Sequence, residues 1–343
     1  MDEVAPKRYL LFTYARTASN VLMRILNLDE QPSIVSSRQR DYFFLPTLKL
    51  RAGEDKLSER HVSLWTDAQR EGLMEAFQSS FEALRSHTEE GITQKKDVFV
   101  KEHVAWLTDP VAEYRLSHQC KMDSESPWTV ENWEAQGHSI RNETVLPDEF
   151  LRIWLPTFLI RHPAISFPSF FRTSVDLQGF EKAMEDAASA LDMTLHWTRS
   201  LYDWYAEEGN LPSASGGRRT TWPIVLDADE LLSSADLVRV YAKAIGLDPN
   251  LLKFSWPATG YPDLNTMPKF VQRMTDTLNN SKGVIAGRPP DQIDITTEAV
   301  KWKSEYGEAA AAMIEKRVQA AMPDYEYMSA RVLRSQDIEV LSR

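Results

Sequence analysis

The sequence of 343 residues contains a single cysteine, Cys120, and therefore cannot form an intrachain disulfide. Its strongest apolar run, residues 150–160, is interrupted by Arg152 and Pro156 and is shorter than the roughly 18 residues that cross a bilayer. The first fifteen residues lack the basic and apolar regions of a secretion signal. These absences predict a cytoplasmic protein with no membrane segment.

Basic charge is also scarce. The chain has 39 Lys and Arg against 50 Asp and Glu, a formal net charge of −11. A nucleic-acid partner is not expected, because neutralising phosphates requires a basic field, and any anion site must be local. The seven histidines show no spacing typical of zinc ligands, so no metal is expected.

Glycine is absent from the beginning of the chain, where the first glycine is Gly53. The phosphate loop of kinases and NTPases, GxxxxGK[ST], needs glycines after the first strand. An ordinary P-loop kinase is therefore disfavoured. A higher affinity for ATP than for other nucleotides would support the kinase interpretation.

What is present is an alternation of strand and helix patterns. Apolar residues make up 43% of the chain, as in ordinary globular proteins. Short strand-like runs, each followed by a helical pattern, lie at residues 8–14, 97–100, 157–160 and 222–226. The alternation predicts an α/β fold, a three-layer sandwich with a central, mostly parallel sheet flanked by helices.

The organisation along the chain favours a single domain over residues 1–343, with a core at about 8–325 and a tail at 326–343. Helical spacing predicts long helices at 180–208 and 297–321. Residues 111–150 contain few periodic apolar positions, which is typical of a long insertion or a lid.

The segment TYARTASN, which ends at Asn20, joins the first strand to the first helix. A cation, Arg16, and several small or hydroxyl residues stand where free backbone N–H groups and a helix dipole can hold an anion. The segment therefore predicts a phosphate-binding loop. The alternative is an N-capped helix with Arg16 as a solvated surface charge.

Two further clusters follow buried strands. Arg161 precedes Ser169 by eight residues, at a strand end and a helix start, and could bind a phosphate, although it could also cap a loop. Lys101 and His103 lie two residues apart, so on a strand their side chains share a face. A lone histidine, however, is most often structural.

In this order, TYARTASNV, KEH and RHPAISFPS resemble the TYPKSGTTW, KTH and RNPxxxxxS motifs of the sulfotransferases that use 3′-phosphoadenosine 5′-phosphosulfate (PAPS). The resemblance covers about residues 8–325, and VLPDEFLRIWLPTFLIRHP is similar to a fungal-type branch. It implies a fold like that of P-loop-containing nucleotide hydrolases, PAPS or its product PAP as the bound nucleotide, and no metal.

The resemblance also implies roles for particular residues. His103 would be the catalytic base, with Lys101 and Arg16 meeting the charge on the transferred group. Ala18 stands where the family has glycine, and a positive φ there would cost roughly 1 kcal/mol. The nucleotide would be bound by the residues that match the motifs: Arg16, Thr17, Ala18, Ser19, Asn20, Arg161, Ser169 and, by a weaker match, Lys282 and Gly283.

The implied reaction is transfer of a sulfuryl group from PAPS to a hydroxyl of a small, apolar or aromatic metabolite. Its pocket would be lined by residues 30–50, 104–147 and 190–205, although many of their aromatic side chains belong to the core. Ala18 and the altered C-terminal motif leave open a non-sulfating step of specialised metabolism, such as elimination or cyclisation. A non-catalytic nucleotide-binding module is the other alternative, and a homodimer is one possible assembly. The aromatic residues considered are Tyr42, Phe43, Phe44, Trp106, Trp128, Trp197, Trp204 and Tyr205.

Overall fold

Four parallel strands form the central sheet, in the order β2-β1-β3-β4. They are β1 (Arg8–Thr13), β2 (Val98–His103), β3 (Leu155–Ile160) and β4 (Ile224–Asp227). Nearly every residue of these strands is buried, as expected when helices cover both faces of a parallel sheet. The computed structural model confirms the predicted α/β fold with a parallel sheet.

The structure describes residues 5–35, 41–53, 55, 57–118, 125–131, 137–185, 191–208, 222–257 and 269–334. Cys120 and residues 335–343 of the predicted tail lie outside these ranges. The helices are α1 (Ser19–Leu26), α2 (Leu45–Arg51), α3 (Asp67–Gln94), α4 (Val104–Leu107), α5 (Pro110–Ser117), α6 (Asp148–Arg152), α7 (Pro163–Gln178), α8 (Phe180–Glu185), α10 (His196–Glu208), α11 (Ala228–Ser233), α12 (Ala235–Ala244), α13 (Lys269–Asn280), α14 (Ile295–Tyr306) and α15 (Glu308–Ser329).

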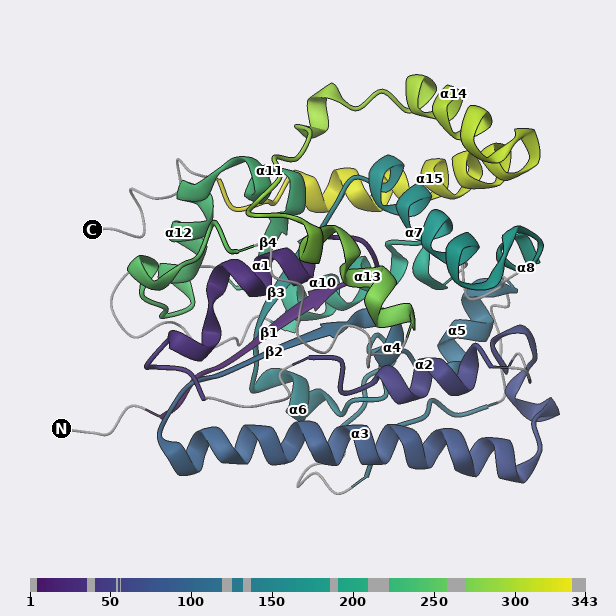
Figure 1. The fold of residues 1–343 in the computed structure, drawn as a ribbon. Coiled ribbons are helices and arrows are strands. Elements are labelled where there is room, and N and C mark those ends of the chain that lie inside the picture. The colour runs from purple at the N-terminus through teal and green to yellow at the C-terminus, as the bar shows by residue number, and fades with distance from the viewer. Residues whose placement is uncertain are drawn as a thin grey trace.

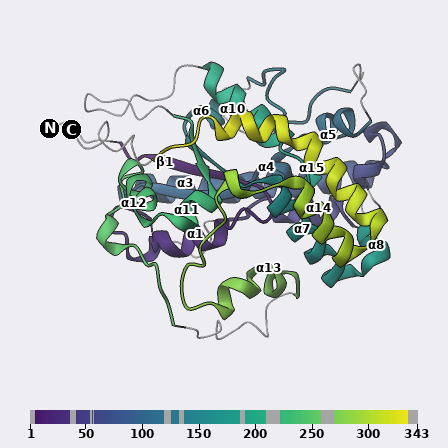
Figure 2. The ribbon, with the colours of Figure 1, turned by 90° about the horizontal axis from the view of Figure 1, so that it is seen from above.

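Alternate residues of β1 supply two hydrophobic cores. Leu10 and Phe12 pack on one face with side chains of α3, α10 and α15, whereas Tyr9 and Leu11 pack on the other with α1 and α12. Figure 1 shows the long α3 along the lower edge of the molecule and α15 in its upper part, below α14. Figure 2 shows α1 and α12 on the opposite side of the sheet from α10 and α15. The central strand is therefore shielded from water on both faces.

The register of the strands brings the predicted motifs together. Thr13, the last residue of β1, is paired with His103, the last residue of β2. The ends of β3 and β4 are aligned in the same way, with Ile160 paired with Asp227. Because carboxyl ends of parallel strands meet at one edge, the segments after Thr13, Ile160 and Asp227 all begin at that edge, where α/β proteins bind ligands.

The C-terminal half departs from the predicted helices. The expected helix at 180–208 is not continuous, because α10 starts anew at His196, whose N–H donates to the Thr194 hydroxyl oxygen at 3.1 Å. The expected helix at 297–321 is two helices that turn at Gly307, which has φ 84°. Helix α15 continues past residue 325, and Leu333 donates to the Val225 carbonyl at 2.9 Å, so part of the predicted tail lies against β4.

The described parts of residues 111–150 pack onto the body of the protein. Asp109 accepts hydrogen bonds from the Val111 and Ala112 N–H groups that begin α5, and also from the Trp128 N–H at 3.1 Å. Val130 donates to the Val145 carbonyl at 3.0 Å. In the described ranges, no helix has both the length and the apolar character needed to cross a bilayer.

Candidate functional site

The loop between β1 and α1 is held in an unusual backbone conformation. Arg16 has φ 68° and Ala18 has φ 57°, both in the left-handed region, and the Thr17 hydroxyl donates to the Tyr14 carbonyl at 3.1 Å. The Ala18 carbonyl then accepts the Val21 N–H at 2.9 Å, which begins α1. Ala18 therefore has the positive φ that is strained for an alanine. The N-terminus of α1 lies at the sheet edge.

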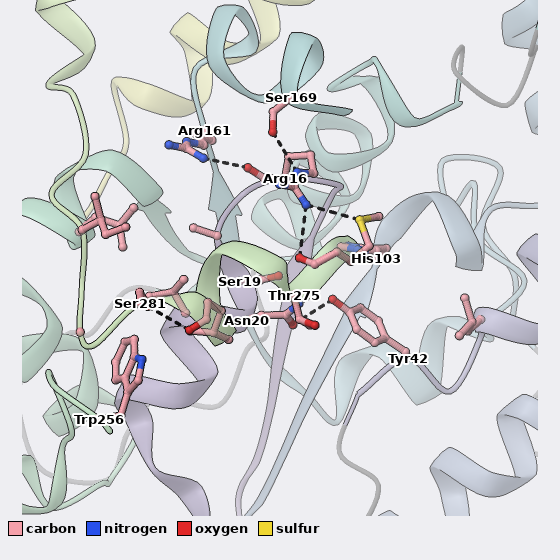
Figure 3. Close-up of a pocket in the computed structure, with 18 of the residues that line it drawn as sticks. Arg16, Ser19, Asn20, Tyr42, His103, Arg161, Ser169, Trp256, Thr275 and Ser281 are labelled. Atoms are coloured by element: carbon pink, nitrogen blue, oxygen red, sulfur yellow. Dashed lines mark hydrogen bonds between the residues drawn. The ribbon is translucent and has the colours of Figure 1, made fainter. Parts of the chain in front are cut away.

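A cavity of about 400 Å³ lies at this edge, beside the N-terminus of α1 (Figure 3). Figure 3 shows Arg16, Arg161 and Ser169 grouped on one side, and Trp256 and Ser281 on the other. The sequence-predicted site residues that line the cavity are Arg16, Ala18, Ser19, Asn20, His103, Arg161, Ser169 and Gly283.

Three predicted residues do not line the cavity. The Thr17 side chain is buried within the loop, and Lys101 is fully buried and contacts Asn20. Lys282 is exposed. Gly283 pairs with Ser255 in an extended segment in which alternate residues face opposite sides, so Ser281 and Gly283 face the cavity and Lys282 does not.

Lys101 carries a charge that is compensated before any ligand binds. Its Nζ lies 2.9 Å from Asp41 Oδ2, donates to Asn20 Oδ1 at 2.5 Å, and sits 4.0 Å from the centre of the Tyr42 ring. Burial lowers the pKa of Lys101, but Tyr42 and Asp41 more than offset this, and the net pKa is raised. Because Asn20 Oδ1 also accepts from the Tyr42 hydroxyl at 3.2 Å, the NH₂ group is the donor that Asn20 has left.

The hydrogen bonds of His103 define its tautomer. The Thr13 hydroxyl donates to the Glu102 carbonyl at 3.1 Å, and its oxygen lies 2.6 Å from His103 Nδ1. With the hydroxyl hydrogen on the Glu102 carbonyl, Nδ1 is the donor in the second contact, which leaves the lone pair on Nε2. Burial and, after it, the nearby Lys101 lower the pKa of His103, a hydrogen bond to the Thr13 backbone opposes both, and the net pKa is about 3. His103 is thus neutral at physiological pH.

Aromatic and aliphatic side chains surround His103. Its ring centre lies 5.1 Å from that of Tyr42 and 4.4 Å from that of Trp106, which it meets edge to face. Leu45 and Leu48 continue this wall of the cavity. This end of the cavity suits an apolar or aromatic molecule.

The positive charge in the cavity comes from Arg16. Arg16 Nε donates to Ser169 Oγ at 3.0 Å, and Nη1 donates to the Met274 carbonyl at 3.4 Å. Burial lowers the pKa of Arg16 to about 10, and nearby arginines act in the same direction, so the side chain is still protonated at neutral pH. The sequence predicted that Arg16 lies in the loop. It did not predict that the Arg16 guanidinium contacts Ser169.

Arg161 is held by a buried carboxylate. Its Nε and Nη2 donate to the two oxygens of Asp229 at 3.0 and 2.9 Å, and Nη1 donates to the Arg16 carbonyl at 3.2 Å. The Tyr14 hydroxyl accepts the Arg161 N–H at 2.9 Å and donates to its carbonyl. Asp229, which the sequence analysis did not single out, is therefore part of the site.

Other lining residues were also missed. Met274, Thr275 and Leu278 of α13 form one wall, and Trp256 lies near Gly283. The spacing of Met274 and Leu278, four residues apart, was the available signal for a helix face. Of the eight aromatic residues considered for the pocket, only Tyr42 and Trp106 line it, whereas others, such as Tyr205, whose hydroxyl donates to the Leu151 carbonyl at 2.9 Å, pack in the core.

Two fungal proteins are similar to the chain over nearly its whole length. Sulfotransferase ppzF of Metarhizium majus (strain ARSEF 297) is 42% identical over 332 residues, which cover 96% of this chain and 98% of that protein. Sulfotransferase ppzF of Metarhizium rileyi (strain RCEF 4871) is 40% identical over 331 residues, which cover 96% of this chain and 97% of that protein. No protein-family model and no solved structure matches the chain.

Proposed function

The chain belongs to the fungal sulfotransferase family of these two relatives and is a transferase, and from this premise we propose that it transfers a sulfuryl group from PAPS to a hydroxyl of a small, apolar or aromatic metabolite. The observation that carries the proposal is a neutral His103 with its Nε2 lone pair available in the same cavity as a buried, protonated Arg16. A base and an anion site in one cavity are what sulfuryl transfer needs.

The features of the loop support PAPS as the donor. The first N–H groups of α1, at Ser19 and Asn20, have no partner within the helix and carry the positive end of its dipole. Arg16 adds a full charge beside them. An anionic phosphosulfate is stabilised at such a helix N-terminus.

In the proposed reaction, the acceptor hydroxyl gives its proton to His103 Nε2 while its oxygen bonds to sulfur. The bond between sulfur and the bridging phosphate oxygen breaks with its electrons on that oxygen, and PAP leaves. The proton then passes from His103 to solvent. The Asn20 amide NH₂, oriented by Lys101 and Tyr42, and the loop N–H groups meet the charge that develops on the transferred group.

The acceptor end supports an uncharged substrate. Tyr42, Trp106, Leu45 and Leu48 present apolar surface beside His103. A charged acceptor would lose hydration there without gaining a partner among the residues of this wall. A flat or apolar alcohol or phenol fits it best.

The test is incubation with PAPS and a panel of phenols and apolar alcohols, with PAP release and product mass measured together. We expect products heavier by one sulfo group. His103→Ala should abolish transfer and keep PAP binding, while His61→Ala, at a partly exposed position outside the cavity, should keep both. A product that lacks the sulfo group would favour a non-sulfating step, and PAP binding with no turnover of any acceptor would favour a binding module.

A further inference from the structure

Glu102 is a buried acid that the proposed reaction does not use. It lies between Lys101 and His103 at the end of β2, is 0% exposed, and does not line the cavity. Its Oε1 accepts the Phe43 N–H, whereas Oε2 has no hydrogen-bond partner among the described residues. A buried acid with an unpartnered oxygen lowers stability, so stability alone does not account for Glu102.

The residue before Phe43 has a strained backbone. Tyr42 has φ 60°, which is uncommon for a bulky side chain. Its ring lies 5.1 Å from that of His103 and 5.0 Å from that of Trp106, and Figure 3 shows its hydroxyl pointing toward Asn20. Such strain persists only where surrounding contacts over-determine the conformation, and it is most common at functional sites.

Strand β2 and the start of α2 hold both peptide groups that flank Tyr42. The Tyr42 N–H donates to the Lys101 carbonyl at 3.1 Å, which orients the peptide group before its Cα. The peptide group after its Cα is held at both ends. Its N–H, that of Phe43, donates to Glu102, and its carbonyl accepts the Leu45 N–H at 3.1 Å. Because peptide groups are planar, fixing these two planes fixes φ and ψ of Tyr42.

Of these three hydrogen bonds, only the one to Glu102 involves a side chain. The other two join backbone groups and do not depend on residue type. Burial raises the pKa of Glu102 well above its ordinary value, with the Phe43 N–H opposing this, so the neutral acid is favoured. A neutral carboxyl group still has a carbonyl oxygen that accepts the Phe43 N–H.

We propose that Glu102 is a positioning residue for the acceptor substrate, because it holds Tyr42 in the left-handed conformation and so keeps the Tyr42 ring beside His103. The inference rests on the proposed function, in which the acceptor substrate packs against this ring. It gives a role to the middle residue of KEH, for which the resemblance implied none.

Steady-state kinetics at saturating PAPS, with the phenol of the panel that the wild type sulfates fastest, test the proposal. Glu102→Met keeps an unbranched side chain of similar length and removes the oxygen that holds Phe43. We expect KM for the phenol to rise about five- to tenfold, the value of one aromatic contact. PAP affinity should stay within about threefold, because Glu102 does not line the cavity. Glu102→Gln, which keeps an oxygen for Phe43, should restore KM to within about twofold of the wild type.

A double-mutant cycle shows whether Glu102 acts through Tyr42. Tyr42→Gly removes the ring and accommodates a positive φ without strain. In the Tyr42→Gly background, Glu102→Met should change kcat/KM for the phenol by less than about twofold. An equal loss in both backgrounds is the result of a merely structural role and would overturn the inference.

Asp97→Leu is the matched control. Asp97 directly precedes β2, and its Oδ1 accepts the Lys7 N–H at 2.8 Å, so it makes the same kind of bond at the other end of the strand. The variant should lose stability in urea denaturation and keep the wild-type KM. A rise in KM as large as that of Glu102→Met would overturn the inference, because any weakening of β2 would then suffice.

A crystal structure of Glu102→Met decides the inference without turnover. Tyr42 at a negative φ supports it, and Tyr42 still near φ 60° overturns it. If Glu102→Met does not fold, Glu102→Thr replaces it in every measurement, because threonine suits a strand and its hydroxyl lies two bonds short of the carboxyl oxygens. A wild type that sulfates no acceptor of the panel would refute the proposed function, whereas the conformation of Tyr42 in the variant tests Glu102 itself, so the two failures are distinguishable.

Discussion

Replacing Ala18 by glycine should stabilise the protein. Ala18 adopts φ 57° and ψ 21° at the N-cap of α1, and its side chain makes no capping hydrogen bond. A Cβ atom in the left-handed region costs roughly 1 kcal/mol, and glycine is also preferred over alanine at an N-cap by several tenths of a kcal/mol. Glycine also loses more backbone entropy on folding than alanine does, and this cost opposes the gain.

The net expectation for Ala18→Gly is a free energy of unfolding higher by about 1 kcal/mol. For a chain of 343 residues this corresponds to an increase in Tm of only about 1–2 °C. Urea denaturation, in which the midpoint rises at constant slope, is therefore the better assay. Affinity for PAP should stay within about threefold of the wild type, because the backbone conformation that presents the loop N–H groups is unchanged.

Ala15→Gly is the matched control. Ala15 lies in the same loop, is 3% exposed, and is not among the described residues with positive φ. Glycine there should lower the free energy of unfolding by about 0.5–1 kcal/mol, through added freedom of the unfolded chain. If Ala18→Gly is as unstable as Ala15→Gly, the strain at position 18 has been misjudged.

Three further outcomes follow from buried ionisable groups. Since the pKa of His103 is lowered to about 3 by burial, transfer should not lose its base between pH 8 and 5, and an acidic limb near 6.5 in the pH–rate profile would contradict this. Burial raises the pKa of Asp227 to about 6, so the folded state keeps a proton that the unfolded state loses near 4, and the free energy of unfolding should fall as the pH rises between these values. Asp227→Asn, which can still accept the helix-capping N–H groups and bond to the Tyr325 hydroxyl, should show a shallower fall in urea titrations across this range, and an identical slope would refute the assignment. Arg51→Leu leaves the carboxylate of Glu113 buried without its 2.9 Å partner and should cost about 3–5 kcal/mol in urea denaturation, whereas a cost below about 1 kcal/mol would mean that Glu113 reaches water or a proton.

The sequence alone determined the elements whose signals are local. Buried apolar runs predicted β1 and β3, and the following polar junctions located Arg16 and Arg161 at strand ends. His103 was found because its spacing from Lys101 and the order of three motifs are properties of the chain itself. The breaks at Thr194 and Gly307 escaped prediction, since apolar spacing continues across a turn that only side-chain capping or a positive φ creates.

Only the tertiary structure decided which side chains meet. Arg16 and Ser169 are 153 residues apart, and their contact depends on how β1 and β3 pair and where α7 begins. The pairing of Arg161 with Asp229 likewise depends on the alignment of β3 with β4. Both partners of such a contact are ordinary residues when read separately, because only the folding of the chain brings the donor to its acceptor.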